Sequence, residues 1–216
     1  MKLFMKLLTI SLFIGAGFLL SQGALEAGTL AALTAGYTYT SATKCRRGSI
    51  QKLYIAGLDD LTSFTLVSGE HGYSNITMVS TKLFYVWTFQ PDQAYAKWEA
   101  NEVENGKDTY NTEVSIYVPQ IGATILEQAQ ELADTCGLVV IAEFYDTGTF
   151  NSNSQTTKLV FGYDEIDLKT IGVQAHISGD SGENREAANG VSVVIKGKQS
   201  ELPYYYDSGT NAIPIS

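Results

Sequence analysis

After residue 41, polar and hydrophobic residues alternate in short runs that are separated by glycine, asparagine and aspartate. Residues 49–56 follow this pattern, with polar side chains expected on the outer face and apolar side chains on the inner face. A period of two is typical of a strand that buries one of its faces. Further strands are predicted at residues 61–66, 75–79, 83–89, 94–103, 108–118, 158–162, 173–178, 190–196 and 202–206.

One segment, at residues 124–135, has the period of an α-helix instead. Thr124 and Glu127 have the spacing of a capping box, in which the threonine hydroxyl accepts the Glu127 amide N–H and the glutamate reaches back. Gly137 is well placed to end the helix in the left-handed conformation. The apolar residues that recur on one helical face are Ile125, Leu126, Ala129, Leu132 and Ala133.

Asn105 and Gly106 lie between the predicted strands at residues 94–103 and 108–118. Asn-Gly tolerates positive φ at both central positions of a two-residue turn, so it fits the type I′ turn that matches the twist of paired strands. The sequence therefore predicts a β-hairpin at this point.

The most apolar predicted strand covers residues 138–144, directly after the helix, and a turn is predicted at residues 146–148. Many strands and one helix predict a mainly β fold, a β-barrel or β-sandwich with one packed α-helix at about residues 124–135. We expect the globular domain at residues 41–207 and a flexible C-terminal arm at residues 208–216.

Residues 1–40 precede this domain as a hydrophobic N-terminal arm or a signal-like segment. Residues 1–6 are a short basic start, and residues 7–20 are an uncharged apolar run that is short for a membrane span. Small residues follow at positions 21–24, where a signal peptidase could cleave, so the pattern is typical of a secretory signal peptide. A hydrophobic arm buried in an assembly and an over-extended gene start are the alternatives.

The charge balance argues against a protein that grips nucleic acid. The chain has 14 Lys and Arg against 23 Asp and Glu, a formal net charge of −9. Affinity for nucleic acid comes mainly from the neutralisation of phosphates by basic side chains. The same negative charge would suit a surface that DNA slides past without sticking.

The sequence contains no pattern of residues that predicts catalysis. The two histidines, His71 and His176, are not part of a ligand-spaced cluster, and a metal centre needs three or more convergent ligands. The acidic residues Asp164, Glu165 and Asp167 lack the glycine and spacing of a calcium loop and favour a solvated loop. The nucleophile elbow and the phosphate-cradling glycine motifs are also missing. We therefore predict no catalytic, cofactor-binding or metal-binding residues and no enzyme activity.

The two cysteines, Cys45 and Cys136, allow at most one internal disulfide. Each could equally be a small buried hydrophobic residue, and free cysteines are among the most buried residue types. We favour two free, buried thiols.

Tyr204, Tyr205 and Tyr206 are consecutive in a predicted strand, so their side chains must point to both faces. Tyrosine is enriched at protein interfaces because it buries a large area at a low entropic cost. A platform on which sugar rings stack is the alternative, and subunit packing is favoured.

Several segments have the same order as in a known family. They are Cys45 followed by residues 48–56, then Lys97-Trp98-Glu99, the helix at 126–133 leading into 138–143, and residues 189–197 before 201–203. On these features, residues 45–207 resemble the tail tube (major tail) proteins of tailed bacteriophages, especially those of phages that infect Bacteroidetes-type hosts.

The resemblance implies a subunit of hexameric rings that stack into the hollow tube of a virion tail, with sheets of neighbouring subunits joined around the lumen. The implied partners are further copies of the chain and other tail proteins. On this resemblance, DNA is expected to pass through the tube without specific binding, and the acidic balance is expected to line the channel. Assembly is expected in the host cytoplasm, with no membrane involved. The terminal arms and the hairpin at Asn105 and Gly106 are expected to bridge rings, and with Tyr204, Tyr205 and Tyr206 these two residues are the candidate subunit-interface residues.

A secreted or cell-surface β-sandwich domain, which binds ligands or forms extracellular filaments, is the alternative from a different class. It applies if residues 1–23 act as a signal peptide. A cleaved N-terminus and a disulfide between Cys45 and Cys136 would favour it, whereas an intact Met1 and reduced cysteines would favour the tail tube.

Overall fold

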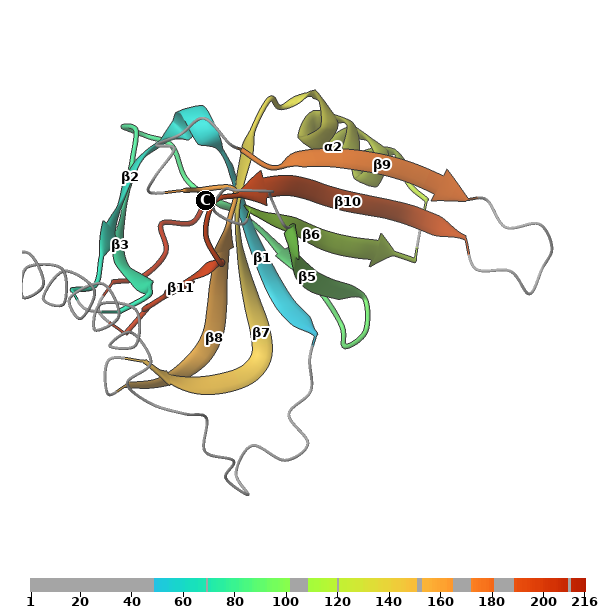
Figure 1. The fold of residues 1–216 in the computed structure, drawn as a ribbon. Coiled ribbons are helices and arrows are strands. Elements are labelled where there is room, and N and C mark those ends of the chain that lie inside the picture. The colour runs from blue at the N-terminus through green and yellow to red at the C-terminus, as the bar shows by residue number, and fades with distance from the viewer. Residues whose placement is uncertain are drawn as a thin grey trace, which may run out of the picture. The chain divides into compact units, whose positions relative to one another are not determined.

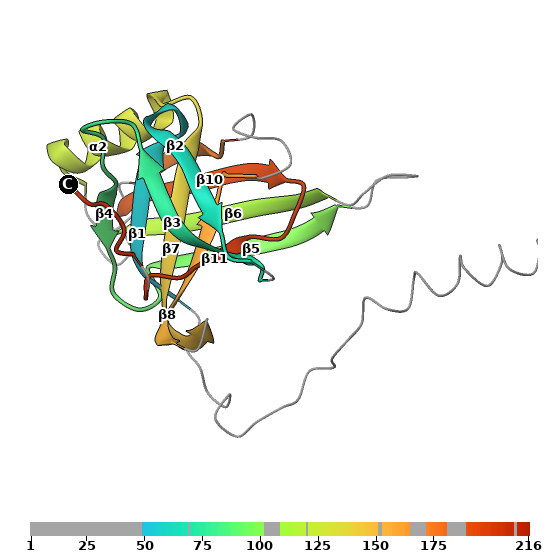
Figure 2. The same cartoon turned by 90° about the vertical axis from the view of Figure 1, so that its left-hand side faces the viewer.

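Two β-sheets and one α-helix make up the described part of the chain in a computed structural model (Figures 1 and 2). The structure describes residues 49–68, 70–101, 109–119, 121–150, 153–164, 172–180, 189–209 and 211–216. The prediction of a mainly β fold with one packed helix is confirmed, in the form of a sandwich.

The larger sheet has seven strands, in the order β2 (Leu61–Leu66), β3 (Gly72–Met78), β11 (Tyr204–Tyr206), β8 (Asn153–Phe161), β7 (Leu138–Phe150), β1 (Ile50–Gly57) and β4 (Tyr85–Thr88). The smaller sheet has four strands, in the order β5 (Ala94–Asn101), β6 (Thr109–Val118), β10 (Gly190–Gln199) and β9 (Gln174–Asp180). These neighbours pair antiparallel, except that β11 and β3 pair in parallel. The helices are η2 (Leu58–Asp60) and α2 (Ala123–Asp134).

The central strand β7 is buried on both faces and separates two hydrophobic cores. Leu138, Val140 and Ala142 face the sandwich core, which the smaller sheet and α2 complete. Val139 and Ile141 face a second core, which β2, β3 and β11 enclose. Figure 2 shows β2 and β3 lying in front of β1 and β7. Burial on both faces explains why the run of apolar residues is continuous rather than alternating.

The prediction of a turn at residues 146–148 is wrong. Strand β7 continues through these residues to Phe150 and stays paired with β8, with an irregularity in register between Glu143 and Thr147. The additional residues on β7 are absorbed there as a bulge, which bends a strand instead of reversing it. Figure 1 shows β7 and β8 curling together toward this end. Pairing with β8 therefore overrides the local turn preference of Asp146 and its neighbours.

The predicted helix is present, but the predicted capping box is wrong. The residue before the helix is Gly122, with an extended backbone and no side-chain cap, so Thr124 lies two positions too far into the helix to cap it. Gly137 has the expected positive φ, +82°, but the helix already ends at Asp134, where Thr135 caps it with an extended backbone, so Gly137 does not end the helix as predicted. Ile125, Ala129 and Leu132 pack against the sandwich core. Two residues of the predicted apolar face, Leu126 and Ala133, are exposed instead.

The prediction of a flexible C-terminal arm at residues 208–216 is also wrong. The Ile213 side chain is buried in the second core. The Phe84 N–H donates to the Pro214 carbonyl at 2.9 Å, and the Ser216 N–H donates to the Phe84 carbonyl at 3.1 Å. The domain therefore includes these residues. The predicted boundary at residue 40 and the signal-like segment lie outside the described residues.

Candidate assembly site

The two outer edges of the four-stranded sheet are the first candidate contact surface. Within the part of the chain that the structure describes, β5 pairs only with β6, and β9 pairs only with β10. An edge strand presents backbone N–H and C=O groups to any strand that approaches it. On β5 the edge also carries aromatic side chains, since Tyr95 is 53% exposed on the outer face and Trp98, on the opposite face near Phe161, is 41% exposed.

Helix α2 covers only part of the β9 side. The helix packs against β9 and β10, and Figure 1 shows β9 extending well beyond it. The distal residues of β9, from Ser178 to Asp180, are exposed. Covering an edge with a helix is one way in which proteins limit edge-to-edge pairing, so the distal half of β9 is the part that stays open.

The outer face of the four-stranded sheet is polar and balanced in charge. Glu113 on β6 lies between its cross-strand partners Lys97 on β5 and Lys196 on β10. Lys196 Nζ lies 3.3 Å from Glu113 Oε2, and Lys97 Nζ lies 2.8 Å from Glu99 Oε1. The shallow hollow over these residues is lined by both signs of charge. Exposed pairs of this kind add little stability, so they characterise the surface more than they hold the fold.

A groove between β4 and α2 is the second candidate surface. Two hollows there, of about 420 Å³ and about 300 Å³, share Tyr85, Trp87 and Gln128 in their linings. Tyr85 is 63% exposed. Among the described residues, the only backbone pairing along this edge of β4 is the parallel bridge between Phe84 and Ile215. Exposed apolar surface beside a sheet edge is typical of a contact region.

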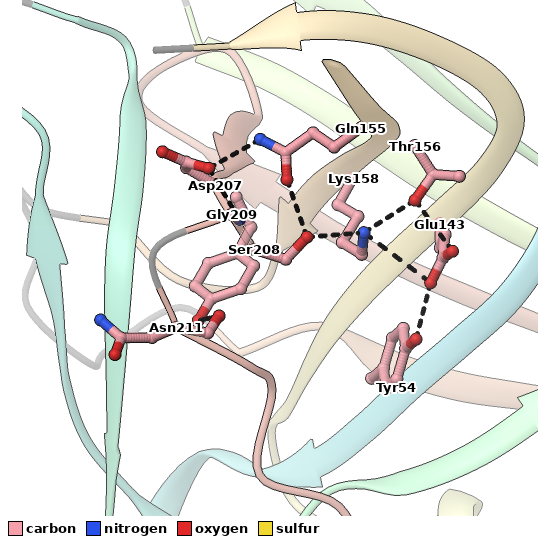
Figure 3. A network of polar contacts seen from close by, with 10 residues as sticks. Tyr54, Glu143, Gln155, Thr156, Lys158, Asp207, Ser208, Gly209 and Asn211 are labelled. Atoms are coloured by element: carbon pink, nitrogen blue, oxygen red, sulfur yellow. Dashed lines mark hydrogen bonds and ion pairs between the residues drawn. The ribbon is translucent and has the colours of Figure 1, made fainter. Parts of the chain in front are cut away.

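A buried polar network lies on the other side of the fold, between β7 and β8 (Figure 3). Glu143 and Lys158 are direct cross-strand partners, and each is only 6% exposed. Lys158 Nζ lies 4.0 Å from Glu143 Oε2. The Tyr54 hydroxyl donates to Glu143 Oε2 at 2.6 Å, and the Thr156 hydroxyl donates to Glu143 Oε1 at 2.9 Å. Both carboxylate oxygens therefore accept a hydrogen bond from a hydroxyl group.

The same network continues from Lys158 to the segment after β11. Lys158 Nζ donates to Thr156 Oγ1 at 2.8 Å and to Ser208 Oγ at 3.0 Å. The Ser208 hydroxyl donates to Gln155 Oε1 at 2.7 Å, and Gln155 Nε2 donates to Asp207 Oδ1 at 2.7 Å. These bonds tie the start of the C-terminal segment to β8.

Burial changes the acid–base properties of this region. Loss of solvation lowers the pKa of Lys158, and the nearby Glu143 carboxylate opposes that shift. Burial and the hydrogen bond to Glu143 raise the pKa of Tyr54. Burial, followed by the nearby Asp207 carboxylate, raises the pKa of Tyr206 to about 12. Both phenols are therefore neutral at physiological pH.

The three consecutive tyrosines all make contacts within the chain. Tyr206 is fully buried in the second core, which removes it from the candidate interface residues. Tyr204 stacks between His71 and Tyr73, with ring centroids 3.7 Å and 4.8 Å away. Tyr205 lies on the opposite face of β11, half-buried, and its hydroxyl donates to Glu70. An interface role for Tyr204 and Tyr205 stays a prediction.

The other predicted interface residues, Asn105 and Gly106, lie outside the described residues. The two arms of their hairpin are confirmed, because β5 and β6 pair in register from Ala94 opposite Ile116 to Asn101 opposite Thr109. The turn itself stays a prediction.

Two polar features differ from the sequence-based expectation. Asp164 is buried and accepts hydrogen bonds from the backbone N–H and the hydroxyl of Ser200, both at 2.6 Å, so it is not part of a solvated loop. Cys136 is an exposed free thiol and not a buried one. Glu165, Asp167 and Cys45 lie outside the described residues. Among the residues that are described, no group of three His, Cys, Asp or Glu side chains could hold a metal ion.

The sequence analysis missed the Glu143–Lys158 pair and the β4–α2 groove. For the pair there was a signal: Glu143 is the one charged residue in the apolar strand at residues 138–144. A buried carboxylate requires a polar or charged partner. Nothing in the local sequence identifies Lys158 as that partner, because the pairing depends on the register of β7 and β8.

Comparison of the chain with protein-family models, curated proteins and solved structures finds no match. Among the described helices, none is long and apolar enough to span a membrane. The function is therefore inferred from the geometry of the sheet and from the order of the elements.

Proposed function

We propose that this protein is a virion structural protein, the subunit of stacked rings that form the tail tube of a bacteriophage. Its partners are then further copies of itself, in hexameric rings, and other tail proteins. DNA passes along the tube without specific binding. The observation that carries the proposal is the four-stranded antiparallel sheet with an open edge at each end, on β5 and on the distal half of β9.

The strand directions suit a closed ring of identical copies. Three successive antiparallel pairings make β5 and β9 run in opposite directions. When copies are related by rotation about a ring axis, β5 of one copy meets β9 of the next in antiparallel orientation. The joined sheets then form one continuous antiparallel barrel. Closure of such a head-to-tail contact removes every exposed edge of this sheet.

The charges on the outer face of the sheet suit a lumen through which DNA moves. Within the described strands, this face carries three lysines and three carboxylates, Lys97, Lys196, Lys198, Glu99, Glu113 and Asp180. Tight binding to DNA requires positive charges that displace counterions from the phosphates. A surface without net positive charge displaces few of them and therefore does not bind DNA tightly. Among the described residues of this face the two signs of charge balance, and the expectation that acidic residues line the channel stays a prediction.

Electron microscopy of the purified full-length chain tests the proposal. Negatively stained particles should include rings or tubes with a central channel. Tyr95→Lys places a charge at the exposed β5 edge and should reduce the fraction of assembled particles. Leu66→Lys is the matched control, because Leu66 is also an exposed apolar residue on an edge strand, but in the other sheet. Uniform monomers of the wild-type chain would contradict the proposal and favour a secreted or surface β-sandwich that binds ligands.

A further inference from the structure

Glu143 and Lys158 are held as two buried groups that do not bond directly to each other. The 4.0 Å between Nζ and Oε2 exceeds a hydrogen-bond distance. The amine instead donates to the hydroxyls of Thr156 and Ser208, and the carboxylate oxygens accept from Tyr54 and Thr156. Thr156 thus contacts both the amine and the carboxylate.

This arrangement destabilises the folded state if both groups stay charged. A buried ion pair recovers its desolvation cost only when its geometry is close and its remaining hydrogen bonds are satisfied. Here the two charged groups lie 4.0 Å apart, and the Thr156 hydroxyl bridges them (Figure 3). Burial also favours the neutral amine, which is the nucleophilic form of lysine. A reaction that removes both charges would relieve the cost.

We propose that Lys158 and Glu143 condense to form an intramolecular isopeptide bond, an amide between their side chains. The geometry that carries this inference is the direct cross-strand pairing of the two residues, with the amine 4.0 Å from the carboxylate in a buried site. Holding two reacting groups next to each other replaces an encounter in solution with a step inside one molecule.

The condensation balances without any further reactant. The lone pair of Lys158 Nζ attacks the Glu143 carboxyl carbon, and a new C–N bond forms. One carboxyl C–O bond then breaks, and the oxygen leaves as water with two protons, so a neutral amine and a carboxylic acid give an amide and one water molecule. No oxidation or reduction takes place.

The surrounding hydroxyls provide the proton transfers that this reaction needs. The Tyr54 hydroxyl, bonded to Oε2, polarises the carboxyl group and stabilises the negative charge that develops on it. The Thr156 hydroxyl accepts from the amine and donates to Oε1, so it can carry a proton from nitrogen to oxygen. The burial of both side chains excludes the water that would reverse the reaction. Tyr54 and Thr156 are thus assigned to positioning and proton transfer, and Lys158 and Glu143 to bond formation.

Mass spectrometry of the full-length wild-type chain tests the proposal directly. After proteolysis, we expect a branched peptide that joins the segments around Glu143 and Lys158 and is lighter by one water than the sum of the two. The cross-strand pair of Glu113 and Lys196 is a matched internal control, because its charged atoms lie closer, at 3.3 Å, but on the exposed face. That pair should give only linear peptides. Linear peptides at Glu143 and Lys158 after prolonged incubation of the folded chain would overturn the proposal.

Two variants separate the chemistry from the fold. Lys158→Met should give no branched peptide and should lower the thermal midpoint. Thr156→Val keeps the shape of the side chain but removes the bridging hydroxyl, so the cross-linked fraction should rise at least several-fold more slowly in freshly refolded protein. An unchanged rate in Thr156→Val would overturn the proton-transfer role assigned to Thr156. The peptide map is read on the monomeric chain, so its outcome does not depend on ring assembly.

Discussion

The ring of Tyr205 covers the backbone of Gly72 in the parallel pairing of β11 with β3. A Cβ atom at position 72 would collide with three carbon atoms of that ring. An aromatic side chain that packs over a strand glycine compensates for the missing side chain. The last strand of the domain is thereby fastened to a strand from near its beginning.

Gly72→Ala should destabilise the domain because the added methyl displaces the Tyr205 ring. We expect a loss of about 1–3 kcal/mol, the usual cost of overpacking, measured by urea denaturation. In a Tyr205→Ala background the same substitution should cost much less. Gly179→Ala is the matched control, since a Cβ there makes only one ordinary contact, at 3.9 Å from the Gly190 carbonyl oxygen. Equal losses in both backgrounds would contradict the packing relationship.

Truncation of Ile213 tests whether the C-terminal residues belong to the domain. Ile213 is 8% exposed and lies in the second core, so Ile213→Ala should cost about 2–4 kcal/mol in the free energy of unfolding. Ile215→Ala should change it by less than about 0.5 kcal/mol, because Ile215 is 54% exposed. Thermal denaturation of both variants compares the two positions. A flexible arm would make the two substitutions equally harmless.

Leu132 and Leu126 test which face of α2 packs on the domain. Leu132 packs against the sandwich core, whereas Leu126 is 46% exposed. Leu132→Ala should therefore cost about 2 kcal/mol or more, and Leu126→Ala should cost well under about 1 kcal/mol. Chemical denaturation monitored by circular dichroism measures both. The reverse order would show that the helix is rotated relative to the described packing.

The raised pKa of Tyr206 makes stability sensitive to alkaline pH. Its folded pKa of about 12 lies above the ordinary value of 10.0, so between these values the unfolded chain has lost a proton that the folded chain retains. The stabilising contribution is complete below pH 10 and is lost as the pH rises from 10 toward 12, by at most about 2–3 kcal/mol. The raised pKa of Tyr54 acts in the same direction.

Urea midpoints at several pH values between 8 and 12 check this prediction. The decline between pH 10 and 12 should be shallower in Tyr206→Phe than in the wild type. Tyr95→Phe should leave the decline unchanged, because Tyr95 is exposed. If the urea midpoint of Tyr206→Phe fell with pH as steeply as that of the wild type, the loss of stability could not be assigned to the Tyr206 phenol.

The existence of most strands followed from the sequence because each strand buries a face, and burial leaves a periodic pattern. Strand β2 matches its predicted range of 61–66, and β1 matches within one residue. Local signals failed where pairing between distant segments decided the outcome. The turn-like residues at 146–148 stay extended because β8 pairs with them, and Leu126 is exposed because the position of the sandwich core sets the rotation of the helix.

The candidate surfaces were less accessible to sequence reasoning than the fold. The open edges of β5 and β9 depend on strand order, which alternation within single strands does not reveal. Tyr206 was expected at an interface because tyrosine is common there, but strand alternation places it in the second core. Lys158 became visible as the partner of Glu143 only through the register of β7 and β8.

Strand β7 supplies alternate side chains to both hydrophobic cores. Neither core can melt alone, because loss of either one exposes a face of the same strand to water. The two halves of the domain therefore unfold cooperatively, as one thermodynamic unit. A calorimetric scan would record this as a single transition, and the effect of a cavity in one core would reach residues that pack only in the other.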